Sequence, residues 1–519
     1  MLKNKHQSEV YIDGCQLKLE DVGLVAKQER KVKLDEKAYK SLNQSRKLIE
    51  TLLSSGEVIY GINTGFGKFK DVKIKPEDTR KLQRNLLLSH AAGVGEPLEP
   101  SVVRAAMLLR ANSLAYGLSG VRSEVIELLL ECLNHGIHPI VPEQGSLGAS
   151  GDLAPLAHLS LVLIGEGLVE WNGQVISGQA ALAKAGLKPI ILEAKEGIAL
   201  LNGTQIMGAL GSLLTLEAEH LAKVADIAGA MSFEAQRGIS DAFLEKVQLA
   251  RPHPGQITCA HNLRRLIAES TLQSNGDKKQ VQDAYSLRCI PQVHGASRQA
   301  FAHLRQVMEI EINSATDNPL VFADRIVSGG NFHGQPLALV LDYAAIALSE
   351  LANISERRIE RLVNPALSNG LPAFLVIDGG INSGYMITQY TAAALVSENK
   401  CLAHPASVDS IPTSANQEDH VSMGTIAGRK ARAILQNTRR VLAIELMCAA
   451  QGLHLRIKQN ENSQLLPGTG VLAAFQEVSK NIPFLENDRE MHLDITKAEQ
   501  LIESGALLST VETAIGPLN

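Results

Sequence analysis

The sequence predicts a mainly α-helical protein built around a bundle of long helices. From about residue 100 onward, apolar side chains recur every three or four residues, which draws one apolar stripe along a helix face. Many stripe positions hold alanine, serine or glycine, and these small residues let helices approach closely. No run of strands alternates with helices, so a doubly wound α/β fold is disfavoured.

Two stripes are long enough to predict bundle helices, namely Leu214, Ala218, Leu221, Ala225, Ala228 and Met231, and then Ala344, Leu348, Leu351, Ser355, Ile359 and Leu362. We therefore expect an N-terminal domain in residues 1–210 and a long-helix bundle in residues 211–519, with an approximate boundary. Near the N-terminus, Asp13-Gly14 between apolar residues predicts the turn of a short hairpin.

The composition excludes several classes of protein. Over 519 residues, 45% are hydrophobic and 20% charged, which is ordinary for a globular protein. The net charge of -5 and an aromatic content of 4% argue against a nucleic-acid partner. No stretch approaches the ~20 uninterrupted apolar residues of a membrane span, and the first residues lack the apolar run of a secretory signal. The six scattered cysteines form no C-x-x-C pair, so we expect a cytoplasmic protein without a zinc site.

The segment from Gly145 to Pro155 is unusually rich in glycine and small residues. One interpretation is a tight loop before a helix, with Asp152 as its cap. A hydrolase nucleophile elbow is disfavoured because Asp152 stands where the G-x-S-x-G pattern needs glycine, and a phosphate-binding loop lacks its Gly-Lys-Ser/Thr ending.

A different chemistry suits Ala149-Ser150-Gly151. Gly151 has the least hindered backbone nitrogen, which can attack the carbonyl of Ala149 if the loop is bent. The β-hydroxyl of Ser150 can then leave as water. The product is a methylidene-imidazolone ring, an electrophile that needs no added cofactor.

The run Gly148-Ala149-Ser150-Gly151-Asp152-Leu153-Ala154-Pro155-Leu156 resembles the signature of the aromatic amino-acid ammonia-lyases. The resemblance extends from about residue 10 to about residue 455 and is closest to the bacterial histidine ammonia-lyases. It implies a helical fold similar to the fumarase/aspartase-like superfamily. It also implies a homotetramer with shared active sites, and a protein-derived 4-methylidene-imidazole-5-one in which Ser150 becomes 2,3-didehydroalanine and a 5-imidazolinone link joins Ala149 to Gly151. No metal or added cofactor is implied. The region after residue 456 matches less clearly and is assigned no role.

The same resemblance assigns roles to residues that have plainer interpretations. Tyr60, in a second glycine-rich loop, would be the base that takes the substrate β-proton, although it could simply pack at a turn. His90, after Ser89, would face the substrate side chain, although a lone histidine is usually a core residue. Asn202 would contact the substrate and the electrophile, although it could be a helix cap.

Three residues near 285 complete the amino-acid end of the expected site. Arg288 would hold the substrate carboxylate through two parallel hydrogen bonds, unless it forms an ordinary surface ion pair. Tyr285, as a catalytic residue, and Gln282 would lie beside the electrophile.

Phe332 and Glu418 would surround the substrate ring. Glu418-Asp419-His420 could also suggest a metal site, but no second histidine follows at helical spacing. In the resemblance, Glu418 hydrogen-bonds an imidazole and Phe332 forms an apolar wall. Since an unpaired buried carboxylate is costly beside a purely apolar ligand, Glu418 favours L-histidine as the substrate, with trans-urocanate and ammonia as products of the first step of histidine degradation.

Other hypotheses remain open at this stage. A tyrosine or phenylalanine ammonia-lyase, or an aminomutase of the same family, would share Ala149-Ser150-Gly151, but Glu418 and Ser89-His90 speak against it. A non-catalytic helical scaffold would have no need of Tyr60 and Arg288. A fumarase-like lyase would have no use for a cyclised tripeptide.

Overall fold

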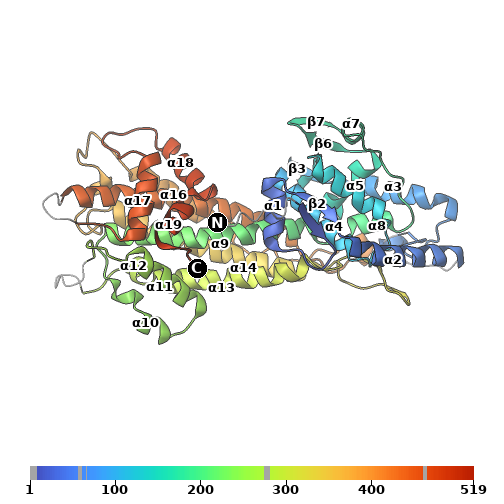
Figure 1. The fold of residues 1–519 in the computed structure, drawn as a ribbon, viewed down its shortest axis with the longest axis horizontal. Helices are drawn as coiled ribbons and strands as arrows, with labels where there is room; N and C mark the ends of the chain where they lie inside the picture. Colours follow the sequence, from blue (N-terminus) through green and yellow to red (C-terminus); the bar gives the residue numbers. More distant parts are fainter. Residues whose placement is uncertain (1–8, 56–60, 66, 274–280, 460–464) are drawn as a thin grey trace. The chain divides into compact units, whose positions relative to one another are not determined.

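The computed structural model describes residues 9–55, 61–65, 67–273, 281–459 and 465–519. Within them the chain is mainly helical, as predicted (Figure 1). It forms two compact units, the first comprising Met1–Leu216, Leu304–Asp342 and Pro405–Arg429, and the second comprising Glu217–His303, Tyr343–His404 and Lys430–Asn519. The boundary near residue 210 stays an approximate prediction, and two later segments join the N-terminal part.

The first unit is built from short and medium helices with a few small sheets. Its α-helices are α1 (Leu19–Gln28), α2 (Glu36–Ser55), α3 (Thr79–His90), α4 (Pro100–Ala115), α5 (Ser123–Asn134), α6 (Leu153–Leu161), α7 (Gly178–Lys184) and α8 (Glu196–Leu201). Its 3-10 turns are η1 (Gly67–Phe69), η2 (Pro76–Asp78), η3 (Val162–Ile164) and η6 (Ser414–Asn416). Helix α4 is buried almost throughout and packs against α1 and α5, and α3 packs against α6 and α8.

The strands form separate two- and three-stranded sheets among the described residues. These sheets pair β1 (Glu9–Ile12) with β2 (Lys31–Leu34), β3 (Val94–Pro97) with β5 (Pro142–Gln144), β4 (His138–Pro139) with β6 (Leu168–Trp171) and β7 (Gln174–Ser177), and β8 (Leu320–Val321) with β9 (Ile326–Val327). The absence of a large parallel sheet from this part of the chain agrees with the prediction.

The predicted N-terminal hairpin is wrong. Strand β1 pairs in parallel with β2, and α1 forms the crossover between them. The Asp13-Gly14 turn does exist, since Asp13 Oδ1 accepts from the backbone nitrogen of Cys15 at 2.9 Å. However, Gly14 N donates to Asn112 Oδ1 at 2.9 Å, so the turn is held against α4 and leads into α1 rather than into a second strand.

The second unit is a helical assembly. It contains α10 (Glu245–Leu249), α11 (Pro254–Leu266), α12 (Tyr285–Arg288), α15 (Met386–Leu402), α17 (Thr469–Asn481), α18 (Met491–Glu503) and α19 (Ala506–Ile515), with the 3-10 turns η4 (Ser240–Phe243) and η5 (Ala373–Leu375). Four long helices contribute residues to both units, namely α9 (Gln205–Ala235), α13 (Ile290–Glu311), α14 (Gln335–Val363) and α16 (Gly424–Gln459). Both predicted stripes lie on these helices and are buried, with at most 2% exposure for any member.

A buried polar network ties the long helices together inside the second unit. Arg358 of α14 donates from two nitrogens to Glu445 of α16, at 2.5 and 2.8 Å. Ser232 of α9 and Ser355 of α14 also donate to that carboxylate. Buried ions are tolerated only when paired and hydrogen-bonded, so this network specifies how these helices face one another within the unit.

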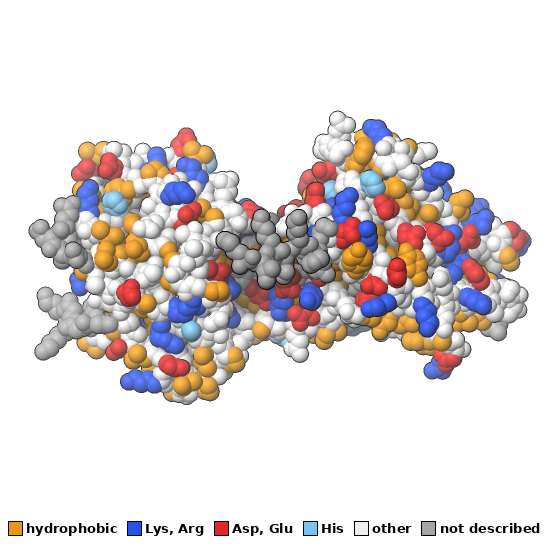
Figure 2. Space-filling view, viewed as in Figure 1, with side chains coloured by type: hydrophobic (Ala, Val, Ile, Leu, Met, Phe, Trp, Pro, Cys, Tyr) orange, Lys and Arg blue, Asp and Glu red, His pale blue; other side chains and the backbone are white. Residues whose placement is uncertain are grey.

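Helix α14 meets the length and composition criteria of a membrane span, and 72% of its most apolar window is buried inside the protein. A buried core helix meets the same criteria. On the visible face of each unit, basic and acidic side chains are interspersed (Figure 2).

Candidate active site

The glycine-rich segment forms a sharply bent loop just before α6. Gly148, Ser150 and Gly151 have φ angles of 85°, 49° and 80°, a region that residues with a side chain rarely adopt. A Cβ at position 148 would lie 2.2 Å from Ser422 Oγ. Close packing therefore requires glycine there, and Ser150 is held in a left-handed conformation at the centre of the tripeptide.

Gly203 holds this bend from the opposite side. Its backbone nitrogen donates to the Ser150 oxygen at 3.3 Å, and its oxygen accepts from Asp152 N at 2.7 Å. A Cβ on Gly151 would lie 2.1 Å from that oxygen. The tripeptide thus has the bent backbone and the unhindered third residue that cyclisation between Gly151 and Ala149 requires.

Asp152 does not use its side chain to cap α6, which is the plainer interpretation of the sequence. Its carboxylate instead accepts from Ile206 N and Met207 N, at 2.9 and 3.0 Å, in the first turn of α9. Thr425 Oγ1 donates to the other oxygen at 2.5 Å. Burial raises the pKa of Asp152, and these hydrogen bonds oppose the rise. The residue after the tripeptide therefore anchors the loop to the N-terminus of a long helix.

A cavity of about 1100 Å³ in the first unit brings five predicted residues together: His90, Ser150, Asn202, Phe332 and Glu418. Ala149 and Gly151 line a smaller cavity of about 220 Å³, which His90 and Glu418 also line. Residues separated by more than 300 positions in the sequence therefore share one site, as expected for an active site assembled from loops.

Glu418 contacts the tripeptide directly. Ser150 Oγ donates to Glu418 Oε1 at 3.4 Å, and Thr413 Oγ1 donates to Glu418 Oε2 at 3.2 Å. Among the described residues, the one cluster with metal-like spacing is Asp226, Cys259 and His294 in the second unit, where Arg298 already pairs with Asp226 at 2.5 Å.

The backbone before Glu418 is strained. Ser414, Ala415 and Asn416 have consecutive φ angles of 51°, 52° and 66°, although none is glycine. Thr413 and Glu418 close this left-handed turn by exchanging backbone hydrogen bonds of 2.9 and 3.3 Å. Each such residue costs about 1–2 kcal/mol, so the conformation persists only because its surroundings hold it.

His90 ends α3 and lies against Ser89, with Ser89 Oγ 3.1 Å from His90 Nδ1. Burial lowers the pKa of His90, while a backbone contact to Leu86 and the charge of Glu418 oppose the change. The lowered pKa favours the uncharged ring, and His90 lines the same cavity as Glu418.

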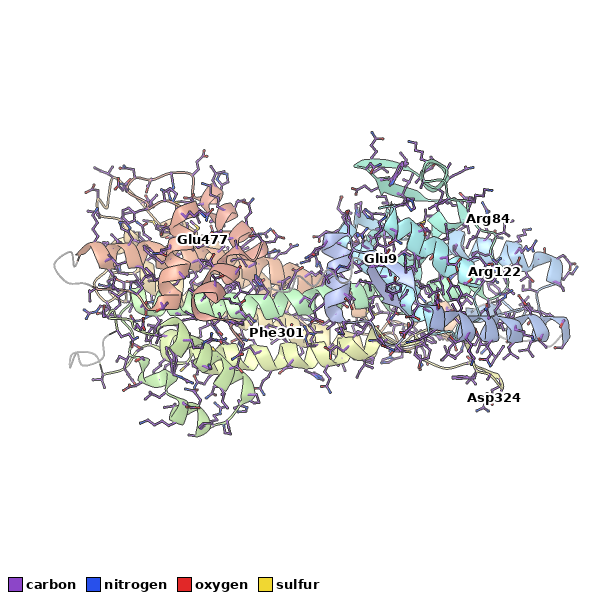
Figure 3. The ribbon with its side chains drawn as sticks, in the orientation of Figure 1. Glu9, Arg84, Arg122, Phe301, Asp324 and Glu477 are labelled. Carbon is purple, nitrogen blue, oxygen red and sulfur yellow. The ribbon has the colours of Figure 1, made fainter. Side chains whose placement is uncertain are left out.

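Asn202 follows α8, whose first turn is anchored by an ion pair. Arg122, labelled in Figure 3, donates to both oxygens of buried Glu196 at 2.7 Å. Arg110, fully buried, donates to the Asn202 carbonyl at 3.1 Å. Asn202 Nδ2 donates to Asn318 O at 3.0 Å.

The other side-chain atom of Asn202 is left without a partner. Asn202 Oδ1 is buried and accepts no hydrogen bond from the described residues. A buried acceptor left unsatisfied costs about 1–3 kcal/mol. Since Asn202 lines the cavity, a ligand with an N–H group would satisfy it.

Three of the predicted residues that the structure describes do not line this cavity or the smaller one. Gln282, Tyr285 and Arg288 belong to the second unit, in and before α12. There Arg288 Nε donates to Asp283 O at 2.9 Å, its guanidinium lies 4.5 Å from the Tyr285 ring centre, and Tyr285 is 70% exposed. Tyr60 lies outside the described residues.

Two further contacts around the cavity were not predicted. Lys70 Nζ donates to Gln417 Oε1 at 2.9 Å, which joins the segment after η1 to the residue before Glu418. His333, next to Phe332, contacts His420. Both contacts join residues far apart in sequence, so no local pattern could have indicated them.

Comparison with known proteins agrees with this site. The family model described as aromatic amino acid lyase matches residues 17–480. A histidine ammonia-lyase of Alkaliphilus oremlandii is 55% identical over 98% of this chain and 99% of its own length.

Among solved structures, histidine ammonia-lyase from Trypanosoma cruzi is 43% identical, with a TM-score of 0.90 over 98% of this chain and 96% of that one. A tyrosine aminomutase from Streptomyces globisporus is 39% identical, with a TM-score of 0.94 over 98% of this chain and 100% of that one. The fold is that of the ammonia-lyases, which share the fumarase/aspartase-like helical architecture. With a family match over nearly the whole length and a bent Ala149-Ser150-Gly151 lining its cavities, the chain belongs to the aromatic amino acid lyase family.

Proposed function

We propose that the chain eliminates ammonia from L-histidine to give trans-urocanate. The observation that carries this proposal is the pair of polar groups that line the same cavity as Ser150: the Glu418 carboxylate, 3.4 Å from Ser150 Oγ, and the ring of His90, whose pKa burial lowers. An imidazole side chain has an N–H to donate to a carboxylate and a second nitrogen that accepts. A phenyl ring has neither and would leave the carboxylate without a partner.

The relatives support the choice of substrate in a different way. The 55% identical relative is a histidine ammonia-lyase, while the TM-score of the aminomutase, 0.94, is higher than that of the Trypanosoma cruzi histidine ammonia-lyase, 0.90. Overall fold therefore does not separate the two reactions. The side chains in the cavity must do so, and Glu418 is the residue that we expect to decide.

We also propose that Ala149-Ser150-Gly151 cyclises to a methylidene-imidazolone with the loss of two waters. The φ angle of 49° at Ser150 and the contacts of Gly203 support this. When formed, the group supplies an electrophile that draws electrons from the substrate and makes the amine easier to expel. Asp152 and Gly203 hold the loop in place, and the unpaired Oδ1 of Asn202 accepts from the substrate amine.

The remaining roles stay proposals. Tyr60 takes the β-proton, Arg288 holds the carboxylate, and Tyr285 and Gln282 flank the electrophile. Because the described cavity is lined by the first unit, we propose that another copy of the chain in a homotetramer supplies the last three. Helix α15 supports self-association, since Ile387 and Tyr390 are each 59% exposed on its surface.

We place this activity in the cytoplasm. The six cysteines, three of them buried, are all free in the structure, which suits a reducing compartment.

The near-ultraviolet absorbance of purified protein mixed separately with L-histidine, L-tyrosine and L-phenylalanine tests the proposal. A urocanate band that grows with histidine alone is expected. A coumarate or cinnamate band would keep the elimination but overturn the substrate. If no band grows, an intact mass lower by two waters would show a cyclised tripeptide without histidine turnover, and an unchanged mass would overturn the electrophile as well.

A further inference from the structure

Two histidines connect the loop that carries Phe332 to the loop that carries Glu418. His333 Nε2 lies 3.3 Å from the backbone oxygen of His420 and 3.3 Å from His420 Nδ1. Their rings are stacked, with centroids 5.3 Å apart. Phe332 directly precedes His333, and Glu418 lies two residues before His420, so this contact joins the two side chains expected to surround a substrate ring.

Helix α14 determines which nitrogen of His333 carries the proton. Gln335 N, at the first residue of α14, donates to His333 Nδ1 at 3.3 Å. Because Nδ1 accepts, the proton of the neutral ring is on Nε2. That N–H faces the oxygen and Nδ1 of His420. His333 thus satisfies a backbone donor at a helix N-terminus with one nitrogen and holds the Glu418 loop with the other.

The loop that carries Glu418 needs contacts with its surroundings to keep its conformation. The turn just before Glu418 contains three consecutive left-handed residues, Ser414 to Asn416, and strain of this kind persists only where surrounding contacts oppose it. On the N-terminal side the hold is the backbone pairing of Thr413 with Glu418. Around and after Glu418, the contact of His420 with His333 adds to two others, from Lys70 Nζ to Gln417 Oε1 at 2.9 Å and from Val421 N to Ser410 Oγ at 3.1 Å.

We propose that His333 is a positioning residue for substrate recognition, which acts through His420 to set the spacing between the Glu418 carboxylate and the Phe332 ring. His333 need not touch the substrate itself. The inference rests on the proposed histidine ammonia-lyase function. The spacing between Glu418 and Phe332 matters for a substrate whose side chain is planar and can donate a hydrogen bond.

Two variants separate the two nitrogens of His333. In His333→Gln the side-chain amide reaches the position of Nε2 and can still donate to His420. In His333→Asn the amide oxygen takes the position of Nδ1 and keeps the contact to Gln335 N, but nothing reaches His420. His135→Asn, at an exposed histidine at the C-terminus of α5, is the matched control.

Steady-state kinetics with L-histidine then give a clear result. The loss of one aligned hydrogen bond is worth about 0.5–1.5 kcal/mol, so His333→Asn should raise KM about 3–10-fold while kcat and the melting temperature change little. His333→Gln and His135→Asn should stay within about twofold of the wild type. A His333→Asn enzyme with normal KM, or one impaired no more than His333→Gln, would overturn the inference.

A double-mutant cycle provides a readout that does not depend on turnover. The Kd of trans-urocanate, measured by titration calorimetry, should rise in His333→Asn and in Glu418→Ala. The His333→Asn change should add less than about twofold in the Glu418→Ala background, since it acts through Glu418. Full additivity would show that His333 acts by another route.

Failure of the proposed function and failure of the positioning role of His333 would give different results. If the wild-type protein neither forms nor binds urocanate, the proposed function is wrong. If the wild-type protein does both and His333→Asn behaves like it, the function stands and the positioning role of His333 is wrong.

Discussion

At the scale of single residues, the site depends on a few side chains whose polar atoms are incompletely hydrogen-bonded by their neighbours. Among the described residues, Asn202 Oδ1 is buried without a partner. Glu418 receives long contacts from Ser150 and Thr413, at 3.4 and 3.2 Å, and burial lowers the pKa of His90. Each of these groups would gain a hydrogen bond from a ligand that carries an amine and an imidazole. Polar groups that lack hydrogen-bond partners or have shifted pKa values are typical of binding sites rather than of a protein core.

Ser150→Ala should abolish urocanate formation without unfolding the protein. The variant lacks the β-hydroxyl that must leave as water, while the backbone contacts of Gly203 remain possible. Absorbance assays measure the activity, and intact mass measures the cyclisation. An active Ser150→Ala enzyme would exclude the electrophile proposed for this tripeptide.

Glu418→Gln should lower kcat/KM for L-histidine about 10-fold or more, because a hydrogen bond to a charged group is worth about 1.5–3 kcal/mol. Residual turnover of L-phenylalanine, which has no ring N–H, should fall less. Parallel assays with both substrates measure the two losses. Equal losses would remove Glu418 from the explanation of specificity.

At the scale of elements, the loops are held by helix ends. Asp152 accepts from the first turn of α9, His333 accepts from the first residue of α14, and Asn202 follows the last residue of α8. Helix N-termini offer unpaired backbone donors, so Asp152 and His333 each gain a fixed partner on a rigid element, while the backbone nitrogen of Asn202 donates to Ile198 O at the end of α8. The strained turn η6 differs, because contacts with other loops, such as that of Lys70 Nζ with Gln417 Oε1, hold it rather than a helix end.

Substitutions at Ala415 test that strain. Ala415 is exposed, with φ 52° and ψ 47°. Ala415→Gly should be stabilising by up to about 1 kcal/mol, since glycine pays no penalty in this region. Ala415→Val should be destabilising and should raise KM, because a branched side chain is least compatible with it. Thermal unfolding and histidine kinetics measure both. If valine were tolerated as well as glycine, the turn would not be under strain.

At the scale of the whole molecule, the residues assigned to one reaction are divided between two compact units. Ser150, Asn202 and Glu418 belong to the first unit, and Tyr285 and Arg288 to the second. A proposed homotetramer accounts for this division if each active site draws residues from different copies of the chain.

Co-expression tests the sharing of sites between subunits. Ser150→Ala and Arg288→Ala chains should each be inactive alone. When they are mixed within one tetramer, some sites should receive an intact Ser150 from one chain and an intact Arg288 from another, so that activity returns. The purified hybrid, selected by two different affinity tags, is assayed for urocanate. A fully inactive hybrid would place both residues of each site on a single chain.

Stability should fall on acidification, in part because of His138. Burial, with the guanidinium of Arg104 beside it, lowers the pKa of His138 to about 4, and Arg104 Nη1 lies 3.1 Å from His138 Nε2. An unfolded histidine titrates near ~6.5, so between about pH 6.5 and 4 the unfolded chain binds a proton that the folded chain does not, and folding weakens as pH falls.

His138→Gln, whose amide oxygen can still accept from Arg104, should reduce the slope of melting temperature against pH in that window. Histidines elsewhere with lowered pKa values, such as His158 and His294, leave part of the slope in place. An unchanged slope in the variant would show that His138 does not contribute.

The sequence alone determined the helical class and the buried stripes of α9 and α14, and it indicated the chemistry that we propose for the tripeptide. These follow from periodicity and from residue types at adjacent positions, which are local properties. The resemblance to a family then indicated Glu418, His90 and Asn202, which the structure brings into one cavity.

The tertiary structure decided what depends on contacts between distant segments. Asp13-Gly14 has the pattern of a hairpin turn. However, Gly14 N donates a hydrogen bond to Asn112, and β1 pairs with β2 in parallel. Asp152 has the pattern of a local cap, yet it caps α9. Local sequence does not predict the strained turn before Glu418 or the His333–His420 contact. Each is maintained by residues that only folding brings close together.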